Sequence, residues 1–390
     1  MSIKIYQGNC LDTLKKIESQ SINTCITSPP YWGLRDYGEG KQLGLEETPE
    51  EFVENLVEVF KEVKRVLRDD GTVWLNLGDS YAGPKGNNRG EGAGGGQKRG
   101  ELMGFNNIKT KVPKGLKSKD LVGIPWRVAF ALQADGWYLR QDIIWHKPNP
   151  MPESVKDRCT KAHEYIFLLS KSVKYYFDNE AIKEDSIYAP GKTHEVEREK
   201  GYYKGKWSNP EKGSRHDGSF KAIREKRNKR SVWTVNTKPF KGAHFATFPP
   251  DLIKPCVLAG CPEKICADCK QPYVRDVKSK RLKRNELPKN DPRYRPNTYE
   301  GSYKDINGKS DAGYTETEDL GLKKQCSCET NKTQGGTVLD PFGGSGTTAL
   351  LANGHNRNAI LCELNEEYIK IAKERLAPDG DLFTDIEVII

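Results

Sequence analysis

The stretch TVLDPFGGSGTTALLANGHNRNAILCE, from Thr337 to Glu363, decides the fold class. An apolar run at 337–340 enters a glycine-rich loop, and an apolar helical stretch at 347–352 leads to a second apolar run at 359–363. A strand that passes through such a loop into a helix and then into another strand is the repeating unit of a parallel α/β sheet. We therefore expect two strands with a helix between them, followed by a helix at 366–376.

The same alternation extends through the first half of the chain. Short apolar runs predict strands there, and a 3.6-residue apolar period predicts helices. The expected strands are 3–6, 22–26, 72–77, 138–145 and 165–169, and the expected helices are 11–17, 49–67 and 124–134. We predict a mainly parallel α/β sheet with helices on both faces.

Polar insertions interrupt this pattern. Residues 82–119 begin with a basic, glycine-rich run that predicts a flexible loop. The other composition changes divide the chain into a first half of the sheet at 1–182, a basic region at 183–243, a return to the sheet at 244–261, a second insertion at 262–334 and a final part at 335–390.

The positive charge of the chain is concentrated in the first of the basic regions. The formal net charge is +9, and residues 192–230 carry thirteen Lys and Arg against six Asp and Glu, with aromatic residues between them. This pattern is typical of a surface that binds a polyanion such as DNA, and a solvated insertion without a partner fits it equally well. Composition alone leaves both interpretations open.

The chain has no features of a membrane or secreted protein. Hydrophobic residues make up 35% of it and charged residues 30%, and no apolar run approaches eighteen residues. The sequence that follows Met1 lacks the apolar core of a secretory signal. We expect a cytoplasmic protein that does not bind a membrane.

The glycine-rich loop has the character of a nucleoside-binding site. Glycines let the backbone approach a ligand closely, and an acidic residue at the end of the next strand, Glu363, can accept hydrogen bonds from ribose hydroxyls. Asp340 would repel a phosphate but suits a cationic arm, and S-adenosylmethionine has both parts. The residues expected to bind it are Asp340, Phe342, Gly343, Gly344, Ser345, Gly346 and Glu363.

A rigid turn follows the expected strand 22–26, with the sequence Thr27-Ser28-Pro29-Pro30-Tyr31. Two prolines fix the backbone and remove two N–H donors, so the Ser28 Oγ and the Pro29 carbonyl oxygen can both accept hydrogen bonds from an amine. Tyr31 offers a ring on which a flipped-out base can stack. A proline-rich turn that only closes a strand is the alternative for this tetrapeptide taken alone.

The two motifs together resemble the β-class DNA amino-methyltransferases, in which the catalytic turn precedes the cofactor loop. The similarity continues in Ile143-Ile-Trp-His-Lys-Pro-Asn-Pro150, in His163-Glu164, in His244-Phe-Ala-Thr-Phe248-Pro249, and in Tyr368 after Glu363. The resemblance implies a permuted seven-stranded Rossmann-like sheet and methyl transfer from S-adenosylmethionine to the amine of a flipped base in double-stranded DNA.

The resemblance also assigns roles along the chain. It implies that Ser28, Pro29, Pro30 and Tyr31 carry catalysis within residues 1–182, and that residues 335–390 hold the cofactor. The basic region 183–243 becomes the expected target-recognition region. Where the family commonly has an acidic residue after the glycine of its first strand, this chain has Asn9, which can still bind the adenine amine of the cofactor.

The target base is inferred from Ser28. A Ser before the proline pair resembles the N4-cytosine enzymes, so cytosine is favoured and N6-adenine is the alternative. A cognate restriction endonuclease is a further expected partner. Methyltransferases of protein glutamine or RNA carry an Asn-Pro-Pro-Tyr turn and a cofactor loop that comes first, and neither feature is present; an inactive zinc-ribbon DNA-binding protein is the more distant alternative.

Four cysteines have the spacing of a metal site. Cys266 and Cys269 form one closely spaced pair, and Cys326 and Cys328 form another. Four thiolates in two such pairs favour a closed tetrahedral zinc site that folds the insertion 262–334 into a small zinc ribbon, and unliganded core thiols are the alternative. Cys256 follows a proline, as in enzymes that methylate carbon 5 of cytosine, but amine methylation needs no thiolate nucleophile, so we expect a core thiol.

Overall fold

A computed structural model describes most of the chain. The described residues are 1–33, 40, 42–83, 112–185, 226–238, 248–282, 289, 314–377 and 385–390. They form two compact units: the first comprises Met1–Ala181, Arg230–Val274 and Lys324–Ile390, and the second comprises Ile182–Lys229 and Arg275–Lys323. Most of the predicted flexible loop 82–119 and most of the basic region 183–243 lie outside the described residues.

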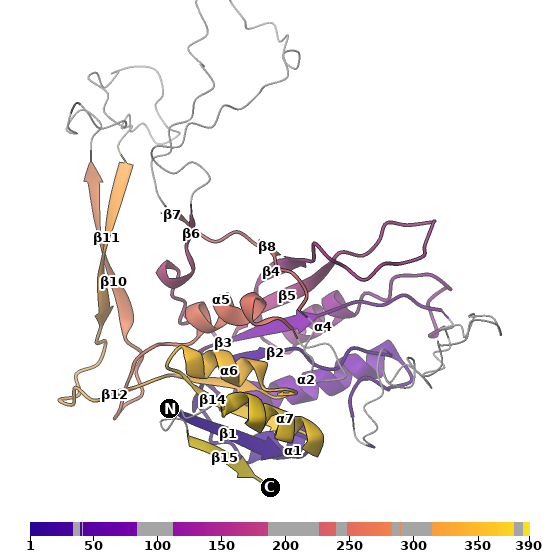
Figure 1. Ribbon diagram of the computed structural model, residues 1–390, viewed down its shortest axis with the longest axis horizontal. Helices are drawn as coiled ribbons and strands as arrows, with labels where there is room; N and C mark the ends of the chain where they lie inside the picture. The colour runs from indigo at the N-terminus through magenta and orange to yellow at the C-terminus, as the bar shows by residue number, and fades with distance from the viewer. Residues whose placement is uncertain are drawn as a thin grey trace, which may run out of the picture. The chain divides into compact units, whose positions relative to one another are not determined.

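A mixed sheet forms the centre of the first unit (Figure 1). Within the described ranges it has nine strands, in the order β15-β1-β14-β13-β2-β3-β5-β4-β8. Neighbouring strands from β1 to β3 pair in parallel, and β5 runs antiparallel to both β3 and β4. The strands are β1 (Ser2–Gln7), β2 (Ile22–Thr27), β3 (Leu67–Leu77), β4 (Tyr138–His146), β5 (His163–Ser170), β8 (Val232–Thr234), β13 (Thr337–Asp340), β14 (Asn358–Glu363) and β15 (Asp385–Ile389).

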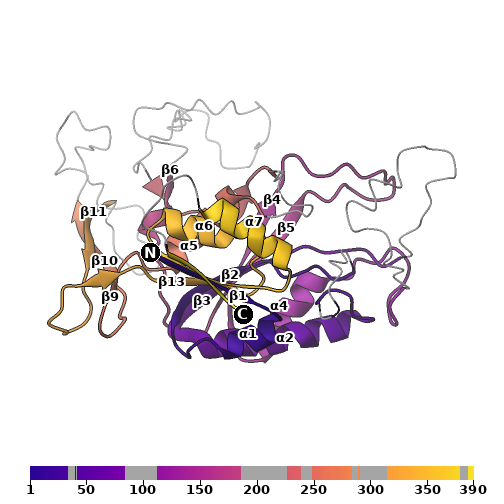
Figure 2. The ribbon, with the colours of Figure 1, turned by 60° about the horizontal axis from the view of Figure 1, so that its bottom comes forward.

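Helices cover both faces of this sheet (Figure 2). On one face lie α1 (Cys10–Lys15), α2 (Pro49–Val66) and α4 (Ile124–Ala134), and on the other lie α5 (Pro250–Gly260), α6 (Thr347–Gly354) and α7 (Glu366–Leu376). Because β2 is buried along its whole length between these layers, it carries no alternation of apolar and polar residues. Among the described helices, none has the length and apolar character needed to cross a membrane.

Local signals in the sequence explain the limits of the longest helix. Thr48 and Glu51 form a capping box at the start of α2, and Pro49 occupies the first helical position, where a missing N–H costs nothing. Its apolar face packs into the core through Phe52, Leu56, Val59, Phe60 and Val63. The helix ends at Val66 because Leu67 adopts an extended conformation and begins β3 directly.

The α/β class is confirmed, and the seven interior strands are those that the sequence predicts. Two edge strands were not predicted: β15 pairs with β1, and β8 pairs with β4. β8 lies in the basic region 183–243, where no strand was predicted, and its three residues are too few to show a period. β3 starts at Leu67 instead of Thr72 because an irregularity in its pairing with β2 admits the polar residues Asp69 and Asp70.

The second unit contains two short sheets. In one, β6 (Glu184–Asp185) pairs antiparallel with β7 (Lys226–Arg227), and Arg227 forms an ion pair with Glu184. In the other, β10 (Val274–Leu282) pairs with β11 (Tyr314–Lys323), which Figure 1 shows as two long neighbouring arrows. The ion pair between Arg275 and Asp319 joins these two strands.

Candidate active site

The two motifs singled out in the sequence meet at one edge of the sheet. β2 and β13 are neighbouring parallel strands, so the Ser-Pro-Pro-Tyr turn and the glycine loop both leave the sheet at its carboxyl edge. The hydroxyl of Thr27, the last residue of β2, donates a hydrogen bond of 2.6 Å to Asp340, the last residue of β13. More than 300 residues of sequence separate these two partners.

The Asp340 carboxylate organises the start of the glycine loop. It is only 2% exposed, and besides Thr27 it accepts hydrogen bonds from the Thr348 hydroxyl at 2.7 Å and from the Phe342 N–H at 3.1 Å. Burial raises the pKa of Asp340 to about 6, although these three donors favour the charged form. Protein donors thus occupy the carboxylate that the sequence assigned to a cationic ligand, and its visible role is to join the loop to β2 and α6.

The glycine loop is shaped by close packing. A Cβ atom added to Gly343 would lie 2.9 Å from the Leu361 Cβ, and Gly346 has a φ of +76°, which side chains rarely adopt. From α7, the Arg375 guanidinium donates to the Ser345 Oγ at 2.9 Å and to the Thr347 Oγ1 at 2.8 Å. The Ser345 side chain therefore binds Arg375, and the loop presents a face with little side-chain bulk.

Glu363 lies beside this loop, at the carboxyl end of β14. Its carboxylate accepts the Gly344 N–H at 2.7 Å and the Asn365 N–H at 2.8 Å. Burial raises the pKa of Glu363. Each oxygen keeps a second lone pair, so ribose hydroxyls can still be accepted. Asn9 follows the adjacent strand β1 and caps α1 by accepting the Leu11 N–H at 2.9 Å.

The Ser-Pro-Pro-Tyr turn holds its tyrosine in a hydrogen-bond network. The Tyr31 hydroxyl lies 2.7 Å from the Glu164 Oε2 and 3.2 Å from the Asn76 Oδ1, and it accepts a hydrogen bond of 3.5 Å from the Ser28 hydroxyl. The Tyr31 ring lies against Gly78, where an added Cβ would approach a ring carbon to 2.5 Å. No described residue donates to the carbonyl oxygen of Pro29.

Several charged groups surround Glu164 at the start of β5. Lys147 forms an ion pair with its second carboxylate oxygen, and the side chains of both residues are less than one-fifth exposed. The Lys147 ammonium also lies 4.2 Å from the centre of the Trp145 ring. Burial lowers the pKa of the neighbouring Lys161 and His163. The carboxylate is therefore balanced by a cation on the side away from Tyr31.

Comparisons with known proteins identify the family. A family described as "DNA methylase", the N6/N4 DNA methylases, matches residues 22–269 and 324–374. The chain belongs to this family. It is therefore an S-adenosylmethionine-dependent DNA methyltransferase, as the resemblance implied.

The similarity to known methyltransferases extends over nearly the whole of this chain. The chain is 39% identical to the type II methyltransferase M.Cfr9I of Citrobacter freundii over 95% of its length and 87% of that protein. It is 37% identical to M.SmaI of Serratia marcescens over 96% of its length and 91% of that protein. Its fold is similar to that of the cytosine-N4-specific PvuII DNA methyltransferase, with a TM-score of 0.51 at 15% identity over 97% of this chain and 89% of that one.

The sequence analysis did not predict several residues of the candidate site. Thr27, Thr348 and Arg375 form hydrogen bonds that hold the two motifs in place. A single Thr or Arg in a strand or helix belongs to no sequence motif that would indicate such a role. Asn76 is a polar residue in the otherwise apolar end of β3, and this position could have indicated a residue of the site. Glu164 lies in a quoted motif, yet no role follows from its position in the sequence.

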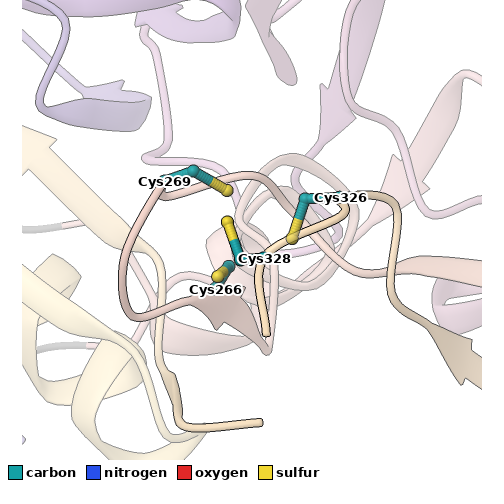
Figure 3. Close-up of side chains that lie close together, drawn as sticks. All are labelled: Cys266, Cys269, Cys326 and Cys328. Atoms are coloured by element: carbon teal, nitrogen blue, oxygen red, sulfur yellow. The ribbon is translucent and has the colours of Figure 1, made fainter. Parts of the chain in front are cut away.

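The four predicted metal ligands gather in one place (Figure 3). The Sγ atoms of Cys266, Cys269, Cys326 and Cys328 all lie within 4.8 Å of one another. Cys266 belongs to β9 (Ile265–Cys266), which pairs with β12 (Thr333–Gln334) beyond the second cysteine pair. Hydrogen bonds led by the Cys269 N–H lower the pKa of the Cys266 thiol to about 7, whereas burial raises the pKa of Cys326 and the neighbouring Cys269 thiol raises that of Cys328 to about 12.

Outside this cluster, the thiols of Cys10, Cys25, Cys256 and Cys362 are buried in the first unit. Burial raises the pKa of Cys10 and of Cys362 to about 12 and that of Cys25 well above its ordinary value. Cys256, the residue after Pro255, is fully buried within α5. Its burial agrees with the predicted core thiol.

Proposed function

We propose that the chain methylates the exocyclic N4 amine of a cytosine flipped out of double-stranded DNA. The observation that supports this most directly is the hydrogen bonding of the Ser28 hydroxyl and the Pro29 carbonyl oxygen. The Ser28 hydroxyl donates to Tyr31, so its lone pairs are directed to other partners, and the Pro29 carbonyl oxygen has no described donor. Two acceptors beside the glycine loop match the two hydrogens of an amine.

The residues of the chain act mainly by positioning. Ser28 and Pro29 accept the amine hydrogens and so concentrate the nitrogen lone pair on the side that attacks. Pro30 keeps the corner rigid, and Tyr31 supports the base by stacking. When bound, S-adenosylmethionine supplies a methyl group on a positively charged sulfur, which leaves as a neutral thioether while the nitrogen gains the methyl group and releases a proton to water.

The glycine loop and its neighbours form the proposed cofactor site. Glu363 accepts the ribose hydroxyls, Asn9 contacts the adenine, and Gly343, Gly344 and Gly346 allow the cofactor to lie against bare backbone. Phe342 and Ser345 line the same loop. Asp340 holds the loop to the catalytic turn and contributes through that geometry.

Mass spectrometry of nucleosides distinguishes the two candidate bases. DNA from a methylation-deficient host that expresses the chain is expected to contain N4-methylcytosine, and DNA from the same host expressing Ser28→Ala is expected to contain little. If the product is N6-methyladenine, the target base is adenine and the proposal of N4-cytosine methylation is wrong. DNA without either modified base would contradict the proposal as a whole.

We propose that the four-cysteine cluster binds one structural zinc ion. The thiols fit the tetrahedral four-sulfur site that zinc prefers, and such a site has no open position for chemistry. Elemental analysis of the purified chain is expected to give one zinc per molecule, and Cys326→Ser should lose most of it. Cys159→Ser, which removes an exposed thiol far along the sequence from the cluster, is the matched control. Equal zinc in all three proteins, or none in the wild type, would contradict the assignment.

The basic region 183–243 is the proposed target-recognition region. Its charge and its position between the two motifs support this role. Reversal of several charges within 192–230 is expected to weaken duplex binding, measured by fluorescence anisotropy, while the affinity for S-adenosylmethionine stays the same. Unchanged duplex binding would exclude this region.

The relatives named above are type II methyltransferases. We propose on this basis that a restriction endonuclease of the same specificity accompanies the chain in the cytoplasm. Its methylation would then protect the host DNA. Host DNA purified from expressing cells is expected to resist that endonuclease.

A further inference from the structure

We infer that Glu164 is a positioning residue that fixes the direction of the hydrogen bonds in the catalytic turn, so that Ser28 faces the target amine only as an acceptor. This inference rests on the proposed role of Ser28 as an acceptor. It is carried by the chain of contacts from Lys147 through Glu164 and Tyr31 to Ser28.

The ion pair between Lys147 and Glu164 fixes which groups in this hydrogen-bond network donate and which accept. Lys147 has hydrogens to donate and no lone pair, and Glu164 as a carboxylate has only lone pairs. The Glu164 Oε2 therefore accepts from Tyr31 at 2.7 Å. The other neighbour at 3.2 Å, the Asn76 Oδ1, is also an acceptor, because the Asn76 amide nitrogen is directed to the Tyr165 carbonyl oxygen.

A tyrosine hydroxyl has a single hydrogen, and that hydrogen is taken by this side of the network. The Tyr31 oxygen can then face Ser28 only as an acceptor, so Ser28 must use its own hydrogen to reach Tyr31. The Ser28 oxygen is left with lone pairs for the substrate. A serine hydroxyl without this constraint could rotate and direct its hydrogen at the amine nitrogen, which would compete for the lone pair that must attack.

Glu164→Gln tests the direction of the network with little change in shape. Lys147 would hold the carbonyl oxygen of the introduced amide, so the amide nitrogen would face Tyr31 and donate to it. The Tyr31 hydrogen would then be free to point at Ser28. We expect the rate of methyl transfer in a single turnover to fall by roughly 10- to 100-fold, with the affinity for S-adenosylmethionine unchanged.

The measurement follows the transfer of a tritiated methyl group from S-adenosylmethionine to unmethylated phage DNA. Glu153→Gln is the matched control, since Glu153 forms a comparable half-buried ion pair with Arg158 in the connection between β4 and β5. This control is expected to keep the wild-type rate. Wild-type transfer tests the proposed function itself, while the ratios between variants test the role of Glu164.

A double substitution separates a directional role from a merely structural one. Once Ser28→Ala has removed the hydroxyl, Glu164→Gln should cost no more than about a twofold further loss of rate. Tyr31→Phe removes the intermediate hydroxyl and should show the same loss and the same dependence on Ser28; it decides the question if Glu164→Gln does not fold. A full additional loss in the double variants, or a wild-type rate for Glu164→Gln, would overturn the inference.

Discussion

The Ser-Pro-Pro-Tyr turn and the glycine loop occupy equivalent places and are built in opposite ways. Each follows the carboxyl end of one of two neighbouring parallel strands, and Thr27 and Asp340 join them there. The turn is stiffened by Pro29 and Pro30, which have no N–H to donate. The loop depends on Gly343 and Gly346, which admit close contacts and a backbone conformation that other residues disfavour.

On the proposed function, this difference allows one sheet edge to bind two ligands. In the turn, the two prolines remove N–H donors and leave oxygen atoms that can accept from a neutral amine. In the loop, N–H groups of Phe342 and Gly344 are bound to the carboxylates of Asp340 and Glu363, so the loop has a fixed shape against which a cofactor can lie. Substitutions should therefore separate turnover from cofactor binding, unless they affect the contact that joins the two segments.

The largest effect is expected in the turn. Ser28→Ala removes one of the two proposed acceptors, and turnover should fall by roughly 10²- to 10³-fold, the range found when one preorganised hydrogen-bond partner is removed from an active site. The affinity for S-adenosylmethionine, measured by calorimetry, should not change. Ser21→Ala, just before the opposite end of β2, is the control and should keep full turnover. A weakened cofactor affinity would show that the two segments do not act separately.

A large effect of pH on stability is expected from Asp340, the carboxylate at the start of the glycine loop. Because burial raises the pKa of Asp340 to about 6, the folded state binds this proton more tightly than the unfolded state does. The resulting stability is present below about pH 4 and is lost as the pH rises through 6. Relative to Asp340→Asn, the wild type should lose about 2 to 2.5 kcal/mol of unfolding free energy between pH 4 and 7, measured by urea denaturation.

Asp12→Asn, at an exposed position on α1, is the control for the loss of a carboxylate. Parallel stability curves for the wild type and Asp340→Asn would mean that the hydrogen bonds from Thr27, Thr348 and Phe342 cancel the cost of burying the charge.

A smaller effect is expected from bulk in the loop. In Gly343→Ala the new methyl group would lie 2.9 Å from the Leu361 Cβ, so the loop must move. Overpacking of this kind typically costs about 1 to 3 kcal/mol, and we expect a similar loss in cofactor affinity with little effect on the rate once the cofactor is bound. Gly354→Ala adds a methyl group to α6 where no atom lies within 4 Å, and it should leave the affinity unchanged. Wild-type affinity for Gly343→Ala would show that the loop yields without cost.

The smallest effect is expected at the contact between the two segments. Thr27→Val removes the 2.6 Å hydrogen bond to Asp340 and should cost about 1 to 2 kcal/mol of unfolding free energy. Cofactor affinity and turnover should both fall a few-fold, because both segments lose a support. Thr24→Val removes a buried hydroxyl of the same strand that bonds to Thr72 instead, so its loss should be confined to stability. If Thr27→Val lowered only turnover or only cofactor affinity, the turn and the glycine loop would not be coupled through this hydrogen bond.

The sequence predicted each interior strand because that prediction needs only local information. Apolar runs and periodic helices mark the buried and half-buried elements from Ser2–Gln7 to Glu366–Leu376. The edge strands β8 and β15 escaped because short segments at an edge owe their conformation to a neighbour. The four cysteines were predictable for another reason, since their spacing alone indicates two pairs.

By itself the sequence determined the fold class, the order of the two motifs and the residue types that each one offers. The tertiary structure decided what those residues are joined to: Asp340 to Thr27, Tyr31 to Glu164, and Ser345 to Arg375. Parallel strands bring their carboxyl ends to one edge, so partners far apart in the chain become neighbours there. Hydrogen bonds act only at short range, and for this reason the direction of the network around Ser28 exists only once the sheet has formed.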